Sequence, residues 1–183
     1  MFTIHAGEYL AGLHIQQRFP KFNLWLPTKD TGTDLLVTNT GNHRAVSLQV
    51  KYGKDFLPDK SADIQKRMRC LSWFKLNAAK LNASSADLWV FVLHSFKHDK
   101  PDFVIIPRDE LRTRMTEIHG SKDANIQSYV CSTETNQCWE VRMPRHDQAL
   151  RQIADGVYNN PTRDFTKYLN DAGWEALTKT LNS

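Results

Sequence analysis

Long apolar runs are scarce in this 183-residue sequence. The longest, residues 88–93, is far shorter than the roughly 20 apolar residues that a bilayer-spanning helix needs. The first residues also lack the basic segment that opens a signal peptide. We therefore expect a cytoplasmic protein with no membrane association.

Cysteine and catalytic signatures are sparse as well. Cys70, Cys131 and Cys138 are odd in number and widely spaced, which argues against a disulfide framework and for a reducing compartment. Cys131 and Cys138 lack the Cys-x-x-Cys pairing typical of zinc sites, so we interpret them as buried thiols. No glycine-rich phosphate loop and no Ser-His-Asp order is present, which excludes a nucleotide cofactor and acyl-transfer chemistry.

The composition itself is average for a globular chain, with 40% hydrophobic and 24% charged residues. It excludes disordered, collagen-like and repeat proteins. The net charge of +4 permits a polyanionic partner without requiring one. The length suits a single domain, residues 1–183, built around one core.

The first part of the chain predicts a helix followed by three strands. Thr3 is a suitable cap for a helix that runs to about Arg18, where Pro20 stops it. Residues 22–26, 34–38 and 45–51 have the character of strands, and the turn-rich connections between them predict an antiparallel meander.

A long helix is predicted next, from Ser61 to about Leu81, because its apolar residues recur at steps of three and four. Its opposite face would be basic, with Lys66, Arg67, Arg69, Lys75 and Lys80. Strands at 88–93 and 103–106, a helix at 108–118, a hairpin at 127–131 and 138–142, and helices at 146–158 and from Thr162 onward complete the prediction. The order α-β-β-β-α-β-β, followed by an α/β tail, predicts an α/β fold in which helices pack on a mixed sheet.

Four polar residues of the predicted first helix and meander stand out. Asp34 begins the second strand, and Gln49 and Lys51 lie two apart on the third, so that they share a face. Glu8 lies on the first helix, which must pack beside this sheet. A carboxylate, an amide oxygen and an ammonium would thus meet at one end of the sheet, with the carbonyl of Val50 between them.

Such a group suits phosphodiester hydrolysis. Mg²⁺ binds one or two carboxylates together with waters and substrate phosphate, so Asp34, Gln49, Val50 and Glu8 are candidate ligands. A bound metal would lower the pKa of a water and neutralise charge on the phosphate. Lys51 would stabilise the developing negative charge or orient the attacking water.

These motifs resemble the PD-(D/E)xK nuclease superfamily. The resemblance rests on residues 7–8, 32–34 and 49–51 and on the order helix, meander, helix, strand, which covers about residues 3–95. It implies a restriction-endonuclease-like core over 3–95, a divergent extension over about 96–183, and a Mg²⁺- or Mn²⁺-dependent endonuclease that acts on DNA in restriction, repair or junction resolution.

The resemblance also implies a role for each residue. Asp34 would be the metal-binding aspartate, Gln49 would occupy the (D/E) position and Lys51 would be the lysine of the motif. Glu8 matches the helical glutamate of archaeal Holliday-junction resolvases. Glutamine in place of an acid removes one negative charge and should weaken metal binding, although Mrr-type restriction enzymes are similar in carrying the Gln-x-Lys form.

Two other functions stay open. The chain could be a catalytically inactive nucleic-acid-binding or assembly module that retains the nuclease fold. It could also be a protein-interaction domain that docks through the helix from about Thr162 onward. For a restriction-type enzyme we expect a homodimer, because a double-strand cut needs two active sites.

Each residue also has a simpler interpretation. Asp34 could be a turn residue, with Asp30 as an alternative metal ligand, and Gln49 and Lys51 could lie on a solvated strand face. Glu8 could serve the helix dipole.

For DNA phosphates we favour Lys54, Lys60, Arg67 and Arg69. The side chains of Trp73, Trp89 and Trp139 should fill the core, although an exposed aromatic ring could stack on a base. We expect His14 and His94 to be structural.

Overall fold

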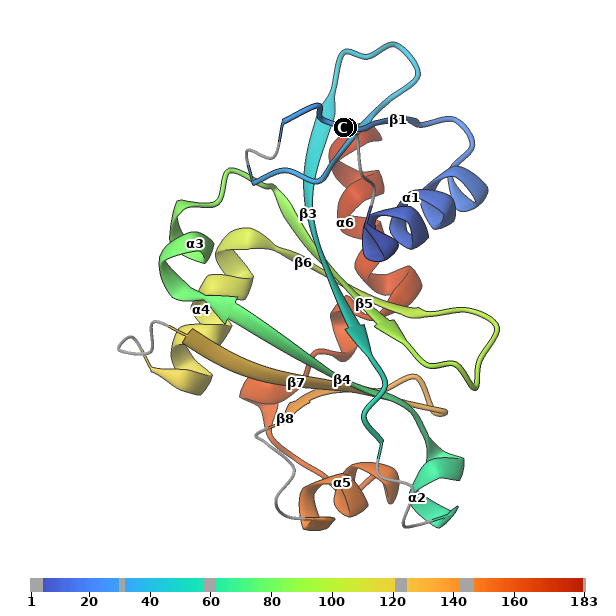
Figure 1. Ribbon diagram of the computed structural model, residues 1–183, viewed down its shortest axis with the longest axis vertical. Coiled ribbons are helices and arrows are strands. Elements are labelled where there is room, and N and C mark those ends of the chain that lie inside the picture. The colour runs from blue at the N-terminus through green and yellow to red at the C-terminus, as the bar shows by residue number, and fades with distance from the viewer. Residues whose placement is uncertain (1–4, 30–31, 58–61, 121–124, 142–146, 183) are drawn as a thin grey trace.

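Two β-sheets with helices packed on them make up the computed structural model (Figure 1). The structure describes residues 5–29, 32–57, 62–120, 125–141 and 147–182. Sheet A is mixed, with the strand order β1-β2-β3-β5-β6, and sheet B has the order β4-β7-β8. The strands of sheet A are β1 (Asn23–Trp25), β2 (Leu35–Thr38), β3 (Ala45–Lys54), β5 (Leu88–His94) and β6 (Asp102–Pro107). Those of sheet B are β4 (Met68–Asn77), β7 (Asn125–Thr133) and β8 (Cys138–Val141).

The predicted meander is confirmed. β1 pairs with β2 and β2 with β3, both antiparallel, and β3 then pairs in parallel with β5. Alternation along β3 sends Leu48 and Val50 into one hydrophobic cluster, which leaves Gln49 and Lys51 on the opposite face.

The helices cover these sheets in layers. α1 (Ala6–Arg18) and α6 (Asn170–Asn182) pack on one face of sheet A (Figure 1). α3 (Ala78–Ala83), α4 (Arg108–His119) and sheet B cover the other face. α2 (Ala62–Arg67) and α5 (Asp147–Ala154) pack together over one end of the far face of sheet B. None of the helices in the described ranges combines the length and apolar character that crossing a bilayer requires.

The long helix predicted from Ser61 to about Leu81 is wrong. The helix α2 ends at Arg67, and the chain continues as the extended strand β4, which pairs along its length with β7. Cys70 and Phe74 face sheet A, whereas Leu71 on the opposite side of the strand faces α2 and α5. Both faces of β4 are covered at this end, so apolar residues occur on both sides of the strand. Their spacing in the sequence therefore resembles the period of a helix.

Three helix limits also differ from the predicted ones. The first helix starts at Ala6 with His5 as its N-cap, and Thr3 lies outside the described residues. α5 ends at Ala154, close before Gly156, whose φ of 71° is left-handed. The helix predicted from Thr162 begins at Asn170, after two short 3₁₀ turns, Pro161–Arg163 and Thr166–Tyr168.

The late start of α6 has a physical reason. Asn170 has a left-handed φ of 49°, which breaks a helix. Its side chain accepts a hydrogen bond from the backbone N–H of Phe103 and donates one to Asp102, so it fastens this break to β6.

Close packing of α1 on β3 gives a first prediction. A Cβ at Gly7 would lie 2.9 Å from the Cβ of Tyr52 and 3.3 Å from Cγ1 of Val50. Gly7→Ala should therefore lower the free energy of unfolding by about 1 kcal/mol or more, because overpacking outweighs the gain in helix propensity. Urea unfolding at unchanged m-value measures this loss.

Gly12→Ala is the matched control on the same helix. A Cβ there would meet only the Cδ2 atom of Leu24, at 2.9 Å, which is the end of a flexible side chain. This variant should unfold at nearly the wild-type urea concentration or slightly above it. Equal destabilisation of both variants would contradict tight α1–β3 packing at Gly7.

Candidate functional site

A cleft of about 940 Å³ lies where α1, the loop before β2, β3 and β5 meet β4 and α3. The four residues predicted to be catalytic all line it, namely Glu8, Asp34, Gln49 and Lys51. Val50, the remaining one of the four predicted metal ligands, lines it too. The structure therefore brings together residues that are up to 43 positions apart in the sequence (51 − 8).

Asp34 is fastened to β3 just before β2 begins. Its backbone N–H donates to the carbonyl of Leu48 at 2.8 Å. Its Oδ2 accepts from the backbone N–H of Val50 at 2.6 Å and from the Nε2 of Gln49. The carboxylate thus does satisfy a backbone donor, as the turn interpretation expected, but that donor belongs to the neighbouring strand.

Lys51 lies above the ring of Trp89 on the next strand. Its Nζ is 5.6 Å from the ring centroid, within the range of a cation–π contact. Trp89 is buried, as predicted, and this limits where its ring can move. Lys51 and Gln49 are half-buried, so they are not on a freely solvated face.

Glu8 both caps the first turn of α1 and lines the cleft. Its Oε2 accepts a hydrogen bond from the backbone N–H of His5 at 3.1 Å, which caps the first turn of α1. It also lines the cleft, on the α1 side of sheet A. Both interpretations that the sequence left open are therefore compatible with its position.

Tyr52 lies beside the cleft with its hydroxyl 2.7 Å from Nδ1 of His94. Burial raises the pKa of Tyr52, so the phenol stays neutral. His14 stacks on Phe103 and Trp174, and burial lowers its pKa. His94 therefore has a hydrogen-bonding role and His14 a packing role.

The residues predicted to contact DNA are scattered. Lys54 lines a groove next to the cleft, and Lys60 lies outside the described residues, as does Asp30. Arg67 forms ion pairs with Asp63 and Asp155, between α2 and α5. Arg69 donates to the buried Asp102 at 3.0 Å, and neither arginine lines the cleft.

Several cleft residues were missed as site candidates. Lys75 and Asn77 on β4 and Lys80 on α3 form the wall opposite Asp34. The signal was the alternation of Phe74 and Leu76 with Lys75 and Asn77, which the helical interpretation obscured. Trp73 belongs to the same strand, and its prediction as a core residue is wrong because 37% of it is exposed. Trp139 is buried as predicted.

The lining of the cleft contains several oxygen donors and the imidazole of His5, and no cysteine or methionine sulfur. No group of three or more His, Cys, Asp or Glu side chains is placed to hold a metal within the described ranges. All three cysteines are buried, and burial raises the pKa of Cys70 to about 12, so the thiols are neither ligands nor nucleophiles. Two carboxylates, the Gln49 amide and the Val50 carbonyl suit Mg²⁺ better than Zn²⁺.

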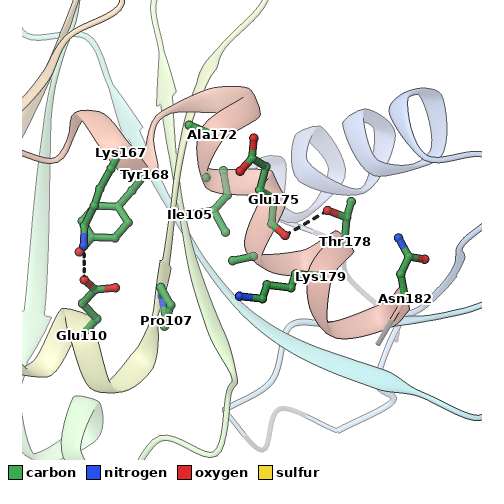
Figure 2. A pocket seen from close by; sticks show the side chains of 12 residues that line it. Ile105, Pro107, Glu110, Lys167, Tyr168, Ala172, Glu175, Thr178, Lys179 and Asn182 are labelled. Atoms are coloured by element: carbon green, nitrogen blue, oxygen red, sulfur yellow. Dashed lines mark hydrogen bonds and ion pairs between the residues drawn. The ribbon is translucent and has the colours of Figure 1, made fainter.

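A second cavity, of about 520 Å³, lies between β6, α4 and the last helix. Figure 2 shows that the Nζ of Lys167 and the carboxylate of Glu110 meet at one end of it, whereas Glu175 and Lys179 come from α6. None of the predicted site residues lines this cavity. The candidate chemistry therefore lies in the first cleft.

No protein-family model, no curated protein and no solved structure matches this chain. The interpretation of the cleft therefore rests on its own geometry.

The position of Arg69 generates a prediction about stability. Asp102, 5% exposed, accepts hydrogen bonds from Arg69, from Ser132 at 2.7 Å and from Asn170 at 3.0 Å. Arg69→Met should lower the free energy of unfolding by about 3 kcal/mol, because it leaves a buried carboxylate without its cation. Urea unfolding near pH 7 measures the effect.

Arg67→Met serves as the comparison, since Arg67 pairs with the exposed Asp63 and Asp155. It should cost less than about 1 kcal/mol. If Arg69→Met were as stable as Arg67→Met, the assignment of Arg69 to a structural ion pair would be wrong.

Proposed function

We propose that this protein is a Mg²⁺- or Mn²⁺-dependent endonuclease that hydrolyses phosphodiester bonds in DNA. The observation that carries the proposal is the convergence of Glu8, Asp34, Gln49 and Lys51 in one cleft. Independent surface residues have no reason to meet in this way, whereas phosphodiester hydrolysis requires oxygen ligands and a cation side by side.

The arrangement of the strands supports a restriction-endonuclease-like topology for this proposal. A helix precedes an antiparallel meander, and a crossover then leads to a strand parallel to β3. This is the order that the resemblance implies. The strand β4 within the crossover is an addition to that order, and it supplies the second wall of the cleft.

The donor set fits a magnesium ion that keeps part of its water shell. Asp34 and Glu8 would contribute carboxylate oxygens, with the Val50 carbonyl and the Gln49 amide beside them. When bound, such an ion supplies charge neutralisation at the phosphate and a water of lowered pKa.

The chain's own residues then have distinct tasks. Lys51, held over Trp89, would bring its ammonium to the phosphate and offset negative charge as it develops. The backbone N–H of Val50 and the amide of Gln49 hold the Asp34 carboxylate in place, so no reorganisation is needed when the substrate binds. Lys75 and Lys80 add positive charge on the opposite wall.

The alternative is an inactive nucleic-acid-binding module, and one observation favours it. Gln49 donates its amide N–H to Asp34, an interaction that needs no metal. A cleft with two carboxylates and three lysines could therefore bind a phosphate backbone without cleaving it.

Cleavage assays test the proposal. Asp34→Asn and Lys51→Met should each lower cleavage of plasmid, single-stranded or branched DNA in Mn²⁺ by about 100-fold or more, since each removes charge at the reacting centre. Lys179→Met, a lysine on the second cavity, should cleave like wild type. Full activity of Asp34→Asn would refute the site, and no cleavage by wild type on any of these substrates would favour the inactive module.

Gln49→Glu is a second test, because the substitution should affect the melting temperature in opposite directions without metal and with Mn²⁺. Without metal, it replaces a hydrogen bond by a carboxylate facing Asp34, so the melting temperature should fall. With Mn²⁺, the added charge should tighten binding and give a larger rise in melting temperature than wild type shows. Calorimetric titration checks the affinity directly, and Gln49→Met is the uncharged control. Unchanged Mn²⁺ affinity in Gln49→Glu would argue against a metal at this position.

A further inference from the structure

A shallow groove of about 340 Å³ adjoins the cleft, and its floor contains exposed aromatic rings. It shares Lys51, Tyr52 and Lys75 with the cleft, so the two are continuous. Lys54, Phe56 and Trp73 are the other residues that matter here. We call this surface the aromatic groove.

The side chains of Phe56 and Trp73 are exposed, and a hydrogen bond holds the backbone of Phe56 and the ring of Trp73. Phe56 is 55% exposed, and its backbone N–H donates to the carbonyl of Leu71 at 2.7 Å beside the bridge between Asp55 and Ser72. Trp73 is 37% exposed, and its Nε1 donates to the Oε1 of Gln127 at 2.9 Å. The Trp73 ring and the backbone that carries Phe56 are therefore ordered before a ligand binds, which reduces the entropy loss on binding.

The exposure of Trp73 follows from the incomplete cover of sheet B. Leu71 lies under α2 and α5, whereas Trp73 and Lys75, farther along the same face of β4, are exposed. An aromatic residue at this uncovered end does not serve the core, so another role is needed to explain it.

The charges around the rings identify the kind of ligand. Lys51, Lys54 and Lys75 are the charged residues among those that line the groove, with no carboxylate in that lining. Lysines bind phosphates, and exposed aromatic rings stack on bases, so the combination suits a nucleic acid whose bases are unpaired. In a duplex the bases stack on one another and cannot reach a ring on a protein surface.

We propose that the aromatic groove binds single-stranded DNA beside the cleft, with bases stacked on Phe56 and Trp73 and phosphates on the lysines. The substrate would then be a single strand or the single-stranded arm of a branched molecule. The statement about substrate rests on the proposed nuclease function, whereas the binding of a single strand does not.

A binding experiment tests the stacking directly. The probes are a labelled oligothymidylate of about 15 nucleotides, an abasic strand of the same length and a blunt duplex, all in EDTA. The abasic strand has the same phosphates without bases, so the difference between the first two probes isolates stacking from charge. Wild type should bind the oligothymidylate most tightly of the three.

Phe56→Leu and Trp73→Leu should each weaken oligothymidylate binding by about five- to tenfold and leave abasic binding unchanged. Trp25→Leu is the matched control, because Trp25 is also exposed, and its Nε1 also donates to a side chain, that of Thr38. Unfolding curves establish that the variants are folded. Wild-type affinity in both groove variants, or equal binding of the abasic strand and the oligothymidylate by wild type, would overturn the proposal.

Cleavage of a flapped duplex in Mn²⁺ separates this inference from the proposed function. If the groove variants lose single-strand binding but no protein cleaves any DNA, the nuclease proposal fails and the groove remains a single-strand site. If wild type cleaves and the groove variants cleave and bind every probe equally well, the groove proposal fails and the nuclease stands.

Discussion

The parallel pairing of β3 with β5 is the constraint on which the site depends. Parallel neighbours cannot be joined by a tight turn, so residues 55–87 must cross over the sheet before β5 begins. This crossover contains β4, which pairs with β7 and so forms one edge of sheet B. The crossing is close, since a Cβ on Gly53 would lie 2.7 Å from the Cβ of Ser72. One wall of the cleft comes from the meander and the other from the crossover that the meander's last strand requires.

The parts of the fold that the sequence predicted correctly have a clear local pattern. The meander, β5, β6, α4 and the hairpin of β7 and β8 each show a period or a turn that depends on neighbouring residues only. The convergence of Asp34 with Gln49 also follows from local structure, because the short connection from β2 to β3 fixes the register, with Leu35 opposite Leu48.

The secondary structure of the segment from 61 to 81 could not be predicted in this way, because its apolar residues pack against two different parts of the fold. Leu71 is apolar because α2 and α5 cover it, and Phe74 is apolar because sheet A does. Neither cover is visible from the segment itself. The hydrogen bonds of Arg69 to Asp102 and of Trp73 to Gln127 could not be predicted for the same reason, since each partner is more than 30 positions away. Phe56 lies between the predicted strand 45–51 and the predicted helix from Ser61, where no period marks its neighbours.

Gln49 shows why the two functional interpretations diverge at a single residue. Two carboxylates in contact repel each other unless a cation lies between them, so an acid at this position would make the metal-free cleft unstable. The amide instead donates to Asp34 and removes that repulsion. With glutamine rather than an acid at position 49, the carboxylates that line the cleft are those of Asp34 and Glu8, and three lysines line it with them. In the proposed function, the lysines would offset the charge of a phosphate backbone, and a metal ion bound at Asp34 would complete its shell with oxygens from water and substrate.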